Sequence, residues 1–207
     1  MEKKYLVLAS GSPRRKELLS QLGYDFSVLV TDVEECQHAQ ETAEEYVKRL
    51  SLDKALTALS LLKGNRSEKQ HVVPSSDTVV LDSDIVVLGS DTVVVSQGQV
   101  LEKPSDFADS KRMLTQLANE RHQVMTAVSV VSAVKQKTDI VITDVWFKPL
   151  SEQEIEQYWH TGEPCDKAGS YGIQGLGGRF VTRIEGSYYA VVGLPLFETD
   201  KLLQEFL

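Results

Sequence analysis

Short β-rich segments and amphipathic helices alternate along this chain of 207 residues. In the first pair, the apolar run Tyr5–Ala9 is followed by Ser12, a preferred helix N-cap, and by Pro13, which suits the first helical position. Two links between strands are predicted to be hairpins, around Gln97-Gly98 and Glu185-Gly186. This pattern predicts a mixed rather than wholly parallel α/β sheet. No internal linker is evident, so we expect residues 1–207 to form a single domain.

The middle of the chain carries three further predictions. Phe26–Thr31 is predicted as the second strand, and Thr42 begins a capping box that opens a long helix. Lys54 falls within the apolar stripe of that helix, where a lysine either extends its ammonium to solvent or serves a pocket. Ile85–Leu88 and Thr92–Ser96 are predicted as separate strands, which leaves Asp91 between them at a strand edge.

Composition excludes several classes of protein. With 42% apolar and 25% charged residues, the chain is typical of globular proteins and not of disordered, collagen-like or disulfide-dense chains. The 30 acidic and 22 basic side chains give a net charge of −8, which argues against a nucleic-acid polymer or an anionic membrane as partner. No stretch approaches the ~20 apolar residues of a membrane span, and the first apolar run is too short for a signal sequence. Since Cys36 and Cys165 lie far apart, we expect free thiols and a cytoplasmic location.

The N-terminus of the first predicted helix is a candidate anion site. Arg14 and Arg15 occupy its second and third positions, where the partial positive charge of the helix end disfavours cations. An anion bound to the backbone N–H groups would reverse that penalty, and Ser10 and Ser12 could add hydroxyl donors. The alternative is that both arginines simply lie along the surface, and spacing alone leaves the two interpretations open.

Carboxylates follow several of the predicted strands. Asp91 is suited to hold a divalent cation or to take a proton from water, Glu34-Glu35 follows the second strand, and Glu102-Lys103 ends a hairpin. Taken singly, each acid fits a solvated surface better than a site. Their joint occurrence favours a site, because ligands of open α/β sheets collect at strand ends. The absence of a Walker-type loop, of zinc-ligand spacing and of a Gly-x-Ser-x-Gly elbow argues against those classes of site.

Several uncommon strings then occur in order along the chain. They are Leu8-Ala9-Ser10-Gly11-Ser12-Pro13-Arg14-Arg15, Gly89-Ser90-Asp91-Thr92-Val93, Glu102-Lys103-Pro104, Asp166-Lys167-Ala168-Gly169-Ser170-Tyr171-Gly172-Ile173-Gln174-Gly175 and Val192-Gly193-Leu194-Pro195. Together they resemble the Maf family of nucleoside triphosphate pyrophosphatases over nearly the whole chain, closest to its dTTP/UTP-hydrolysing subtype. The resemblance implies an elongated, mixed α/β sheet flanked by helices, with two lobes around a cleft, related to the inosine triphosphatase fold.

The resemblance also implies an activity. Members hydrolyse a nucleoside triphosphate, here dTTP or UTP and some modified pyrimidine triphosphates, to the monophosphate and pyrophosphate. They use a divalent metal cation (Mg, Mn or Co), often form homodimers, and would keep non-standard nucleotides out of nucleic acids. Carried over by position, Asp91 would be the proton acceptor, and Glu35 with Asp91 would hold the metal. Phosphate contacts are implied for Ser10, Arg14, Arg15, Lys54 and Lys103, and base preference for Arg14, Thr92 and Gln174.

Two alternatives stay open on the sequence. The stretch from Gly64 to Ile85 is longer than is usual in the family and contains Asp77-Thr78-Val79, a second copy of the Asp91-Thr92-Val93 pattern. We choose Asp91 because only this copy precedes a short turn and then the Glu102-Lys103-Pro104 string. For function, the family's association with septum formation and cell division leaves a non-catalytic nucleotide-binding regulator as one alternative. A 7-methyl-GTP-type pyrophosphatase is another.

Overall fold

The computed structural model describes residues 4–64 and 84–207, so the second copy of the motif at Asp77 lies outside the described residues. Helices and strands alternate, as the sequence predicts. The elements, with short 3₁₀ helices marked η, are β1 (Tyr5–Ala9), α1 (Pro13–Gln21), β2 (Phe26–Val28), α2 (Ala43–Gly64), β3 (Ile85–Ser96), β4 (Gln99–Leu101), α3 (Phe107–Leu117), β5 (Arg121–Val131), β6 (Gln136–Phe147), α4 (Glu152–Trp159), η2 (Glu163–Asp166), η3 (Ala168–Ser170), η4 (Leu176–Phe180), β7 (Val181–Glu185), α5 (Tyr188–Val192) and α6 (Leu196–Gln204). None of the described helices is long and apolar enough to cross a membrane.

The strands of the described residues form one seven-stranded sheet. Its order is β2-β1-β3-β5-β6-β7, and β4 pairs with β3 off this path. β1 pairs in parallel with β2 and β3, whereas β3 with β4 and β6 with β7 are antiparallel pairs. The predicted mixed α/β sheet flanked by helices is therefore confirmed. The chain divides into two compact units, the first from Met1–Asp91, Ala127–Ile140 and Leu194–Leu207 and the second from Thr92–Thr126 and Val141–Gly193.

Helix N-termini follow the local signals in the sequence. The Ser12 hydroxyl accepts a hydrogen bond from Arg15 N at 3.4 Å, and Pro13 is the first residue of α1. Thr42 Oγ1 accepts from Glu45 N at 3.2 Å, while the Glu45 carboxylate accepts from Thr42 N at 2.9 Å. Both predicted caps are confirmed, because each satisfies backbone N–H groups that the first turn of a helix leaves without an intrahelical acceptor.

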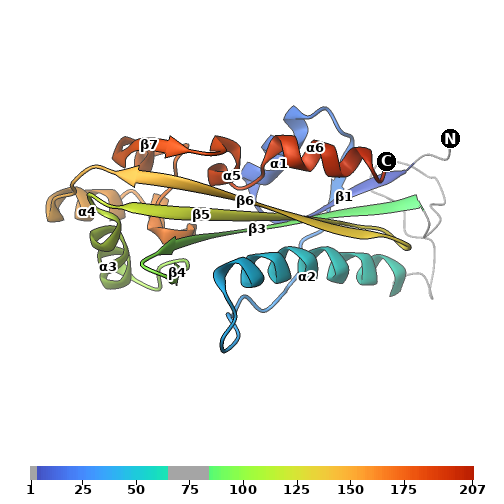
Figure 1. The fold of residues 1–207 in the computed structure, drawn as a ribbon, viewed down its shortest axis with the longest axis horizontal. Helices are drawn as coiled ribbons and strands as arrows, with labels where there is room; N and C mark the ends of the chain where they lie inside the picture. Colours follow the sequence, from blue (N-terminus) through green and yellow to red (C-terminus); the bar gives the residue numbers. More distant parts are fainter. Residues whose placement is uncertain (1–3, 65–83) are drawn as a thin grey trace. The chain divides into compact units, whose positions relative to one another are not determined.

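The first unit has three layers, with β1 and the beginning of β3 in the middle. Figure 1 shows α2 covering one face of these strands, and α1 with α6 covering the other. Ile85 and Val87 of β3 pack with Val7 of β1 and Ala55 of α2 in one apolar cluster, which is therefore the α2 side of the sheet. Since alternate residues of a strand share a face, Asp91 comes to the α2 side as well.

Helix α2 lies very close to β3 at Gly89. A Cβ added at Gly89 would lie 2.2 Å from the Ser51 carbonyl oxygen and 2.9 Å from Ala55 N, so only glycine leaves room for the helix. β3 continues through this glycine and through Asp91 to Ser96. The prediction of two strands with Asp91 at an edge between them is wrong, because the strand continues through the glycine, which marks a close contact with the helix.

The predicted end of the second strand also differs from the structure. β2 ends at Val28 instead of Thr31, because its partner β1 ends at Ala9, one residue beyond the Leu8–Val28 pair.

The hairpin at Gln97-Gly98 is confirmed, with positive φ angles of 52° and 75° at the two turn residues. The prediction of a hairpin at Glu185-Gly186 is wrong. The Ser187 hydroxyl accepts from Ala190 N at 3.2 Å and caps helix α5, so a helix follows β7 there.

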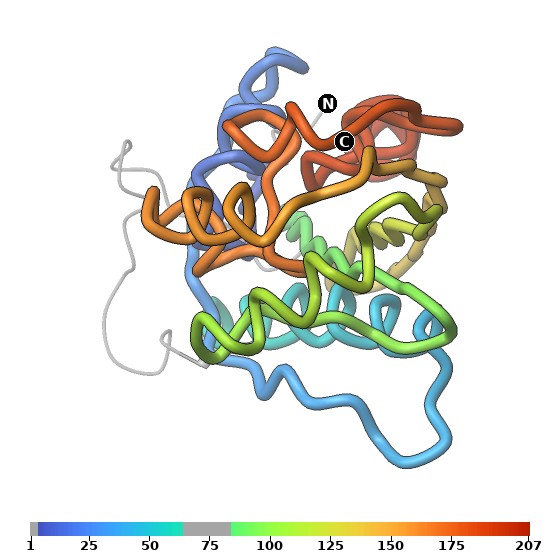
Figure 2. The backbone as a smooth tube through the Cα atoms, turned by 90° about the vertical axis from the view of Figure 1, so that its left-hand side faces the viewer, coloured from blue at the N-terminus to red at the C-terminus, as the bar shows by residue number. Residues whose placement is uncertain are grey.

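The segment between β2 and α2, residues 29–42, has no helix or strand. In the ribbon of Figure 1 and in the backbone tube of Figure 2, it passes below α2 and then turns back into the N-terminus of that helix. Arg49 of α2 holds it there: its Nη2 donates to the Cys36 carbonyl oxygen at 2.9 Å, and its guanidinium donates to both carboxylate oxygens of Glu41 at 2.6 and 2.8 Å. This segment carries Glu35.

The second unit has an aromatic core. His122, Phe147 and Tyr171 contact one another edge to face, with ring centroids 4.7–5.5 Å apart. Phe180 joins them through Phe147 at 5.9 Å and contacts Tyr158 of α4 at 5.0 Å. Edge-to-face pairs of this kind stabilise a core beyond the burial of their area. They tie the loop from η2 to η4, which carries Gln174, to the strands and helix beneath it.

Candidate functional site

The loop after β1 brings Ser10 and Arg15 together. Ser10 is buried, and its Oγ accepts hydrogen bonds from Ser12 N at 3.2 Å and from Arg15 Nη1 at 3.5 Å. Ser12 and Pro13 begin α1, which puts Arg14 and Arg15 in its first turn. Two guanidinium groups and a hydroxyl therefore gather at the N-terminus of a helix, the arrangement predicted for an anion site.

An ion-pair cluster joins α2, β3 and the 29–42 segment. Lys54 Nζ lies 2.6 Å from Asp91 Oδ1 and 2.6 Å from Glu35 Oε1. Lys54 and Asp91 are only 8% and 7% exposed, whereas the Glu35 side chain is 41% exposed. Of the two interpretations of Lys54 in the apolar stripe, the structure contradicts an ammonium extended to solvent, because Nζ is buried and ion-paired with two carboxylates.

Arg15 lies within electrostatic range of the same carboxylates. Burial lowers the pKa of the Arg15 guanidinium, Asp91 and Glu35 oppose that shift, and Arg14 adds to it. Arg14 and Arg15 are both half-buried. The first unit thus brings together six of the predicted residues: Ser10, Arg14, Arg15, Glu35, Lys54 and Asp91.

The remaining predicted residues belong to the second unit. Thr92 follows Asp91 directly in β3, and its Oγ1 lies 3.0 Å from Thr126 Oγ1. Lys103 follows β4 and is exposed. Gln174 is exposed between η3 and η4. Each of the three is thus on a strand or loop of that unit, as its position in the sequence strings suggests.

Glu163 is a residue that sequence reasoning missed. Its carboxylate accepts hydrogen bonds from Tyr158 OH at 2.7 Å, Leu176 N at 2.8 Å and Gly177 N at 3.0 Å. Burial raises the pKa of Glu163, but these hydrogen bonds outweigh burial and lower it below the ordinary value. Glu163 therefore ties down the loop that carries Gln174. Its backbone partners are 13 and 14 residues further along the chain, so no local spacing could have revealed them.

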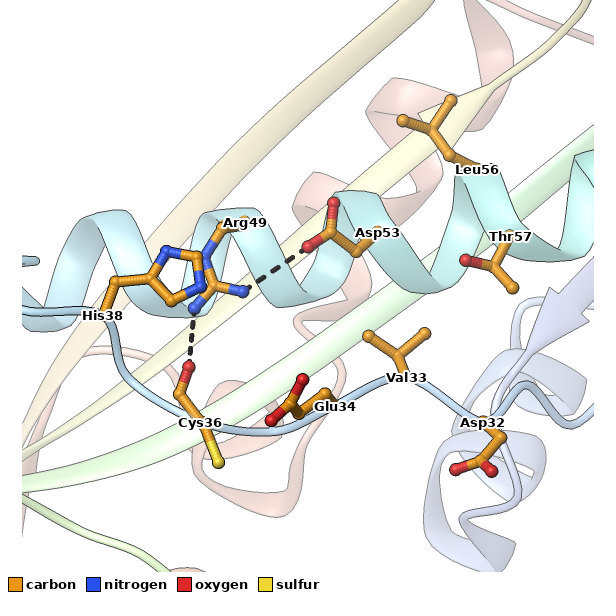
Figure 3. A pocket seen from close by; sticks show the side chains of 9 residues that line it. All are labelled: Asp32, Val33, Glu34, Cys36, His38, Arg49, Asp53, Leu56 and Thr57. Carbon is orange, nitrogen blue, oxygen red and sulfur yellow. Dashed lines mark hydrogen bonds and ion pairs between the residues drawn. The ribbon is translucent and has the colours of Figure 1, made fainter.

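A separate pocket of about 420 Å³ lies between the 29–42 segment and α2. Figure 3 shows its side chains, which come from the 29–42 segment and from α2, with Arg49 bonded to Asp53 and to the Cys36 carbonyl. Its lining residues are Asp32, Val33, Glu34, Cys36, His38, Arg49, Asp53, Leu56 and Thr57. None of the nine residues predicted for the site is in this lining, as far as the structure describes the chain.

The cluster around Lys54 has the chemistry that a divalent cation needs. Across residues 4–64 and 84–207 there is no group of three or more His, Cys, Asp or Glu side chains placed to hold a metal. Glu35 and Asp91, however, both direct an oxygen at one cationic point. One or two carboxylates completed by substrate phosphates are the usual ligands of Mg²⁺ at phosphate-processing sites. The two carboxylates fit that pattern.

Comparisons with known proteins agree with the motifs. A family model described as Maf-like protein matches residues 5–206. The dTTP/UTP pyrophosphatase of Vibrio parahaemolyticus is 66% identical over 202 residues, covering 98% of this chain and 97% of the relative, and that of Vibrio cholerae is 60% identical over 201 residues, covering 97% of each. A solved structure of the Staphylococcus aureus Ham1 protein gives a TM-score of 0.44 at 18% identity, over 70% of this chain and 72% of that one. The family match and the identity of these relatives show that the chain belongs to the Maf family.

Proposed function

We propose that this chain hydrolyses dTTP and UTP, and some modified pyrimidine triphosphates, to the nucleoside monophosphate and pyrophosphate, which limits incorporation of non-standard nucleotides. The observation that carries the proposal is the buried Asp91 carboxylate paired with Lys54 at 2.6 Å, beside Arg15. An ionised carboxylate can take a proton from water, and the cations around it can hold a polyanion next to that water. The names of the relatives at 60–66% identity support the pyrimidine substrates.

In the proposed reaction, water adds to the α-phosphorus. The bond from that phosphorus to the oxygen bridging it to the β-phosphorus breaks, and pyrophosphate leaves with that oxygen. One proton of the attacking water goes to Asp91. Because Asp91 is held in the interior of a strand and paired with Lys54, its carboxylate is positioned before substrate binds.

The cations have a separate role in this proposal. Ser10, Arg14, Arg15, Lys54 and Lys103 contact the phosphates. An arginine grips two phosphate oxygens with its planar fork, while a lysine acts as a point charge. Positive groups placed in advance stabilise the negative charge that develops on phosphoryl oxygens during attack.

Glu35 and Asp91 hold a divalent cation (Mg, Mn or Co) in the proposal. When bound, such a cation supplies further positive charge against the phosphoryl oxygens. The support from this chain is the pair of hard oxygen ligands that converge on one point.

Base preference is assigned to Arg14, Thr92 and Gln174. Thymine and uracil share the O2, N3–H and O4 edge, so one side-chain amide, which both donates and accepts, can read both bases. Gln174 is the amide in the assigned set. We further propose a cytoplasmic enzyme and a homodimer, with neither a nucleic-acid polymer nor a membrane as partner.

Pyrophosphate release from a panel of nucleotides tests the proposal. The panel contains dTTP, UTP, modified pyrimidine triphosphates, purine triphosphates and 7-methyl-GTP, each with Mg²⁺, Mn²⁺ or Co²⁺. Asp91→Asn should abolish turnover and retain nucleotide binding. Asp84→Asn is a matched control, because Asp84 is also buried, at 8% exposure, but lies just before the other end of β3.

Each alternative has its own outcome in this panel. Tight nucleotide binding without turnover by the unmodified chain would indicate the regulator associated with cell division, and preference for 7-methyl-GTP would indicate the other pyrophosphatase subtype. Activity lost in Asp77→Ala but kept in Asp91→Ala would assign the proton acceptor to the second copy of the motif. No hydrolysis of any triphosphate with any of the three metals would contradict the proposal as a whole.

A further inference from the structure

Lys54 is a buried cation shared by two carboxylates. Its Nζ is 2.6 Å from both Glu35 Oε1 and Asp91 Oδ1, and its side chain is only 10% exposed. The helix that carries it is fixed in place, because α2 packs directly on Gly89 of β3. The ammonium therefore stands at the point to which both carboxylates direct an oxygen.

A divalent cation held by the same two carboxylates would need the same point. Mg²⁺ takes oxygen ligands at about 2.1 Å, so the two oxygens would have to move inward by only roughly half an ångström from their distance to Nζ. An ammonium and a divalent cation cannot share that position, since two positive charges so close together repel strongly in a partly buried site.

We propose that Lys54 fills the cation position of this site when no nucleotide is bound, and that it leaves this position when a divalent cation arrives with a triphosphate. The nucleotide half of this inference rests on the proposed function. Occupation of the cation position by Lys54 does not, because it follows from the ion pairs of the chain itself.

The chemistry of lysine suits such an exchange. Its ammonium is a compact charge on a flexible four-carbon stem, so Nζ can move without any change in the helix. A triphosphate offers several anionic oxygens in exchange for the two carboxylates. No covalent bond forms or breaks: one ammonium changes its partners from carboxylate to phosphate oxygens. The exchange makes metal binding weak without nucleotide and strong with it.

Binding of Mn²⁺ alone tests this inference without any nucleotide. Free Mn²⁺ is measured by electron paramagnetic resonance during titration of the unmodified chain, of Lys54→Met and of Lys48→Met. Lys54→Met keeps most of the apolar stem but lacks the ammonium, and we expect it to bind Mn²⁺ about tenfold or more tightly than the unmodified chain. Lys48→Met is the matched control, because Lys48 lies on the same helix but pairs only at the surface, with Glu44 at 3.8 Å.

Two further variants make the outcome decisive. Adding Asp91→Asn to Lys54→Met should abolish the gain, which places the new Mn²⁺ site at Asp91. Lys54→Gln serves as a second neutral variant if Lys54→Met does not fold, as judged by circular dichroism.

Mn²⁺ affinity in a folded Lys54 variant that equals or falls below that of the unmodified chain would overturn the inference, as would an equal gain in Lys48→Met. Failure of the proposed function would be detected separately, in the pyrophosphate-release panel. The Mn²⁺ titration contains no nucleotide, so the two failures are distinguishable.

Discussion

A methyl group on Gly89 would separate helix α2 from strand β3. The added Cβ would lie 2.2 Å from the Ser51 carbonyl oxygen, 2.9 Å from Ala55 N and 3.0 Å from Ala55 Cβ. No flexible side chain can yield there, so the helix has to move by roughly 1 Å to restore ordinary contact distances. Overpacking of a dense core costs about 1–3 kcal/mol, and we expect Gly89→Ala near the upper end because two of the three atoms belong to the backbone.

The same movement should reduce activity. Lys54 precedes Ala55 on α2, so a shift of the helix draws the Lys54 ammonium away from Asp91. We expect Gly89→Ala to lower the free energy of unfolding in urea by about 3 kcal/mol and the melting temperature by roughly 6–12 °C. We also expect kcat/KM for dTTP to fall by about tenfold, which corresponds to about 1.4 kcal/mol of transition-state stabilisation.

Gly11→Ala is the matched control for stability. A Cβ at Gly11 would meet only two methyl carbons of Val30, both at 3.5 Å, which is ordinary contact. Its free energy of unfolding should stay within about 0.5 kcal/mol of that of the unmodified chain. If Gly89→Ala were as stable and as active as the unmodified chain, the close contact at Gly89 would not set the position of Lys54, and the reasoning would be refuted.

Three further perturbations probe other parts of the structure. In the folded chain, burial lowers the pKa of His122 to about 4. The unfolded chain binds a proton on this imidazole near pH 6.5, so the free energy of unfolding in urea should fall by about 3 kcal/mol between pH 6.5 and pH 4. Glu163→Gln turns an amide N–H toward backbone donors and so loosens the loop that carries Gln174. We therefore expect KM for dTTP to rise roughly tenfold, with a smaller change in kcat. Arg49→Met removes the hydrogen bonds to Glu41, so amide hydrogen exchange in residues 32–42 should become faster.

Each of these has a control on the same chain. The pH dependence should flatten in His122→Phe and persist in His160→Phe, because His160 is exposed; an unchanged slope in His122→Phe would exclude this histidine as its source. Glu156→Gln, an exposed position on α4, should leave KM unchanged, and an equal effect there would contradict the role of Glu163. Lys48→Met should leave exchange in residues 32–42 as it is. Unaltered exchange in Arg49→Met would mean that other contacts hold the segment.

The parts of the fold that depend on near neighbours could be predicted from the sequence. The caps at Ser12 and Thr42 and the hairpin at Gln97-Gly98 were correct, because each is closed by hydrogen bonds or dihedral preferences within about four residues. The sequence did not correctly predict the end of β2 or the helix after Gly186. β2 stops where its partner β1 stops, and pairing partners lie outside any local window.

For the candidate site, the sequence determined which side chains are present and on which segments they lie. The motifs marked Ser10, Arg15 and Asp91, and the odd lysine in an apolar stripe marked Lys54. Only the tertiary structure decided that Lys54 faces inward, to an aspartate 37 residues further along the chain and to Glu35 on a segment without helix or strand. The physical reason is the packing of α2 on β3: Gly89, which lies between two runs predicted as separate strands, is the point where the helix meets the strand, and that contact brings the ammonium to the carboxylates.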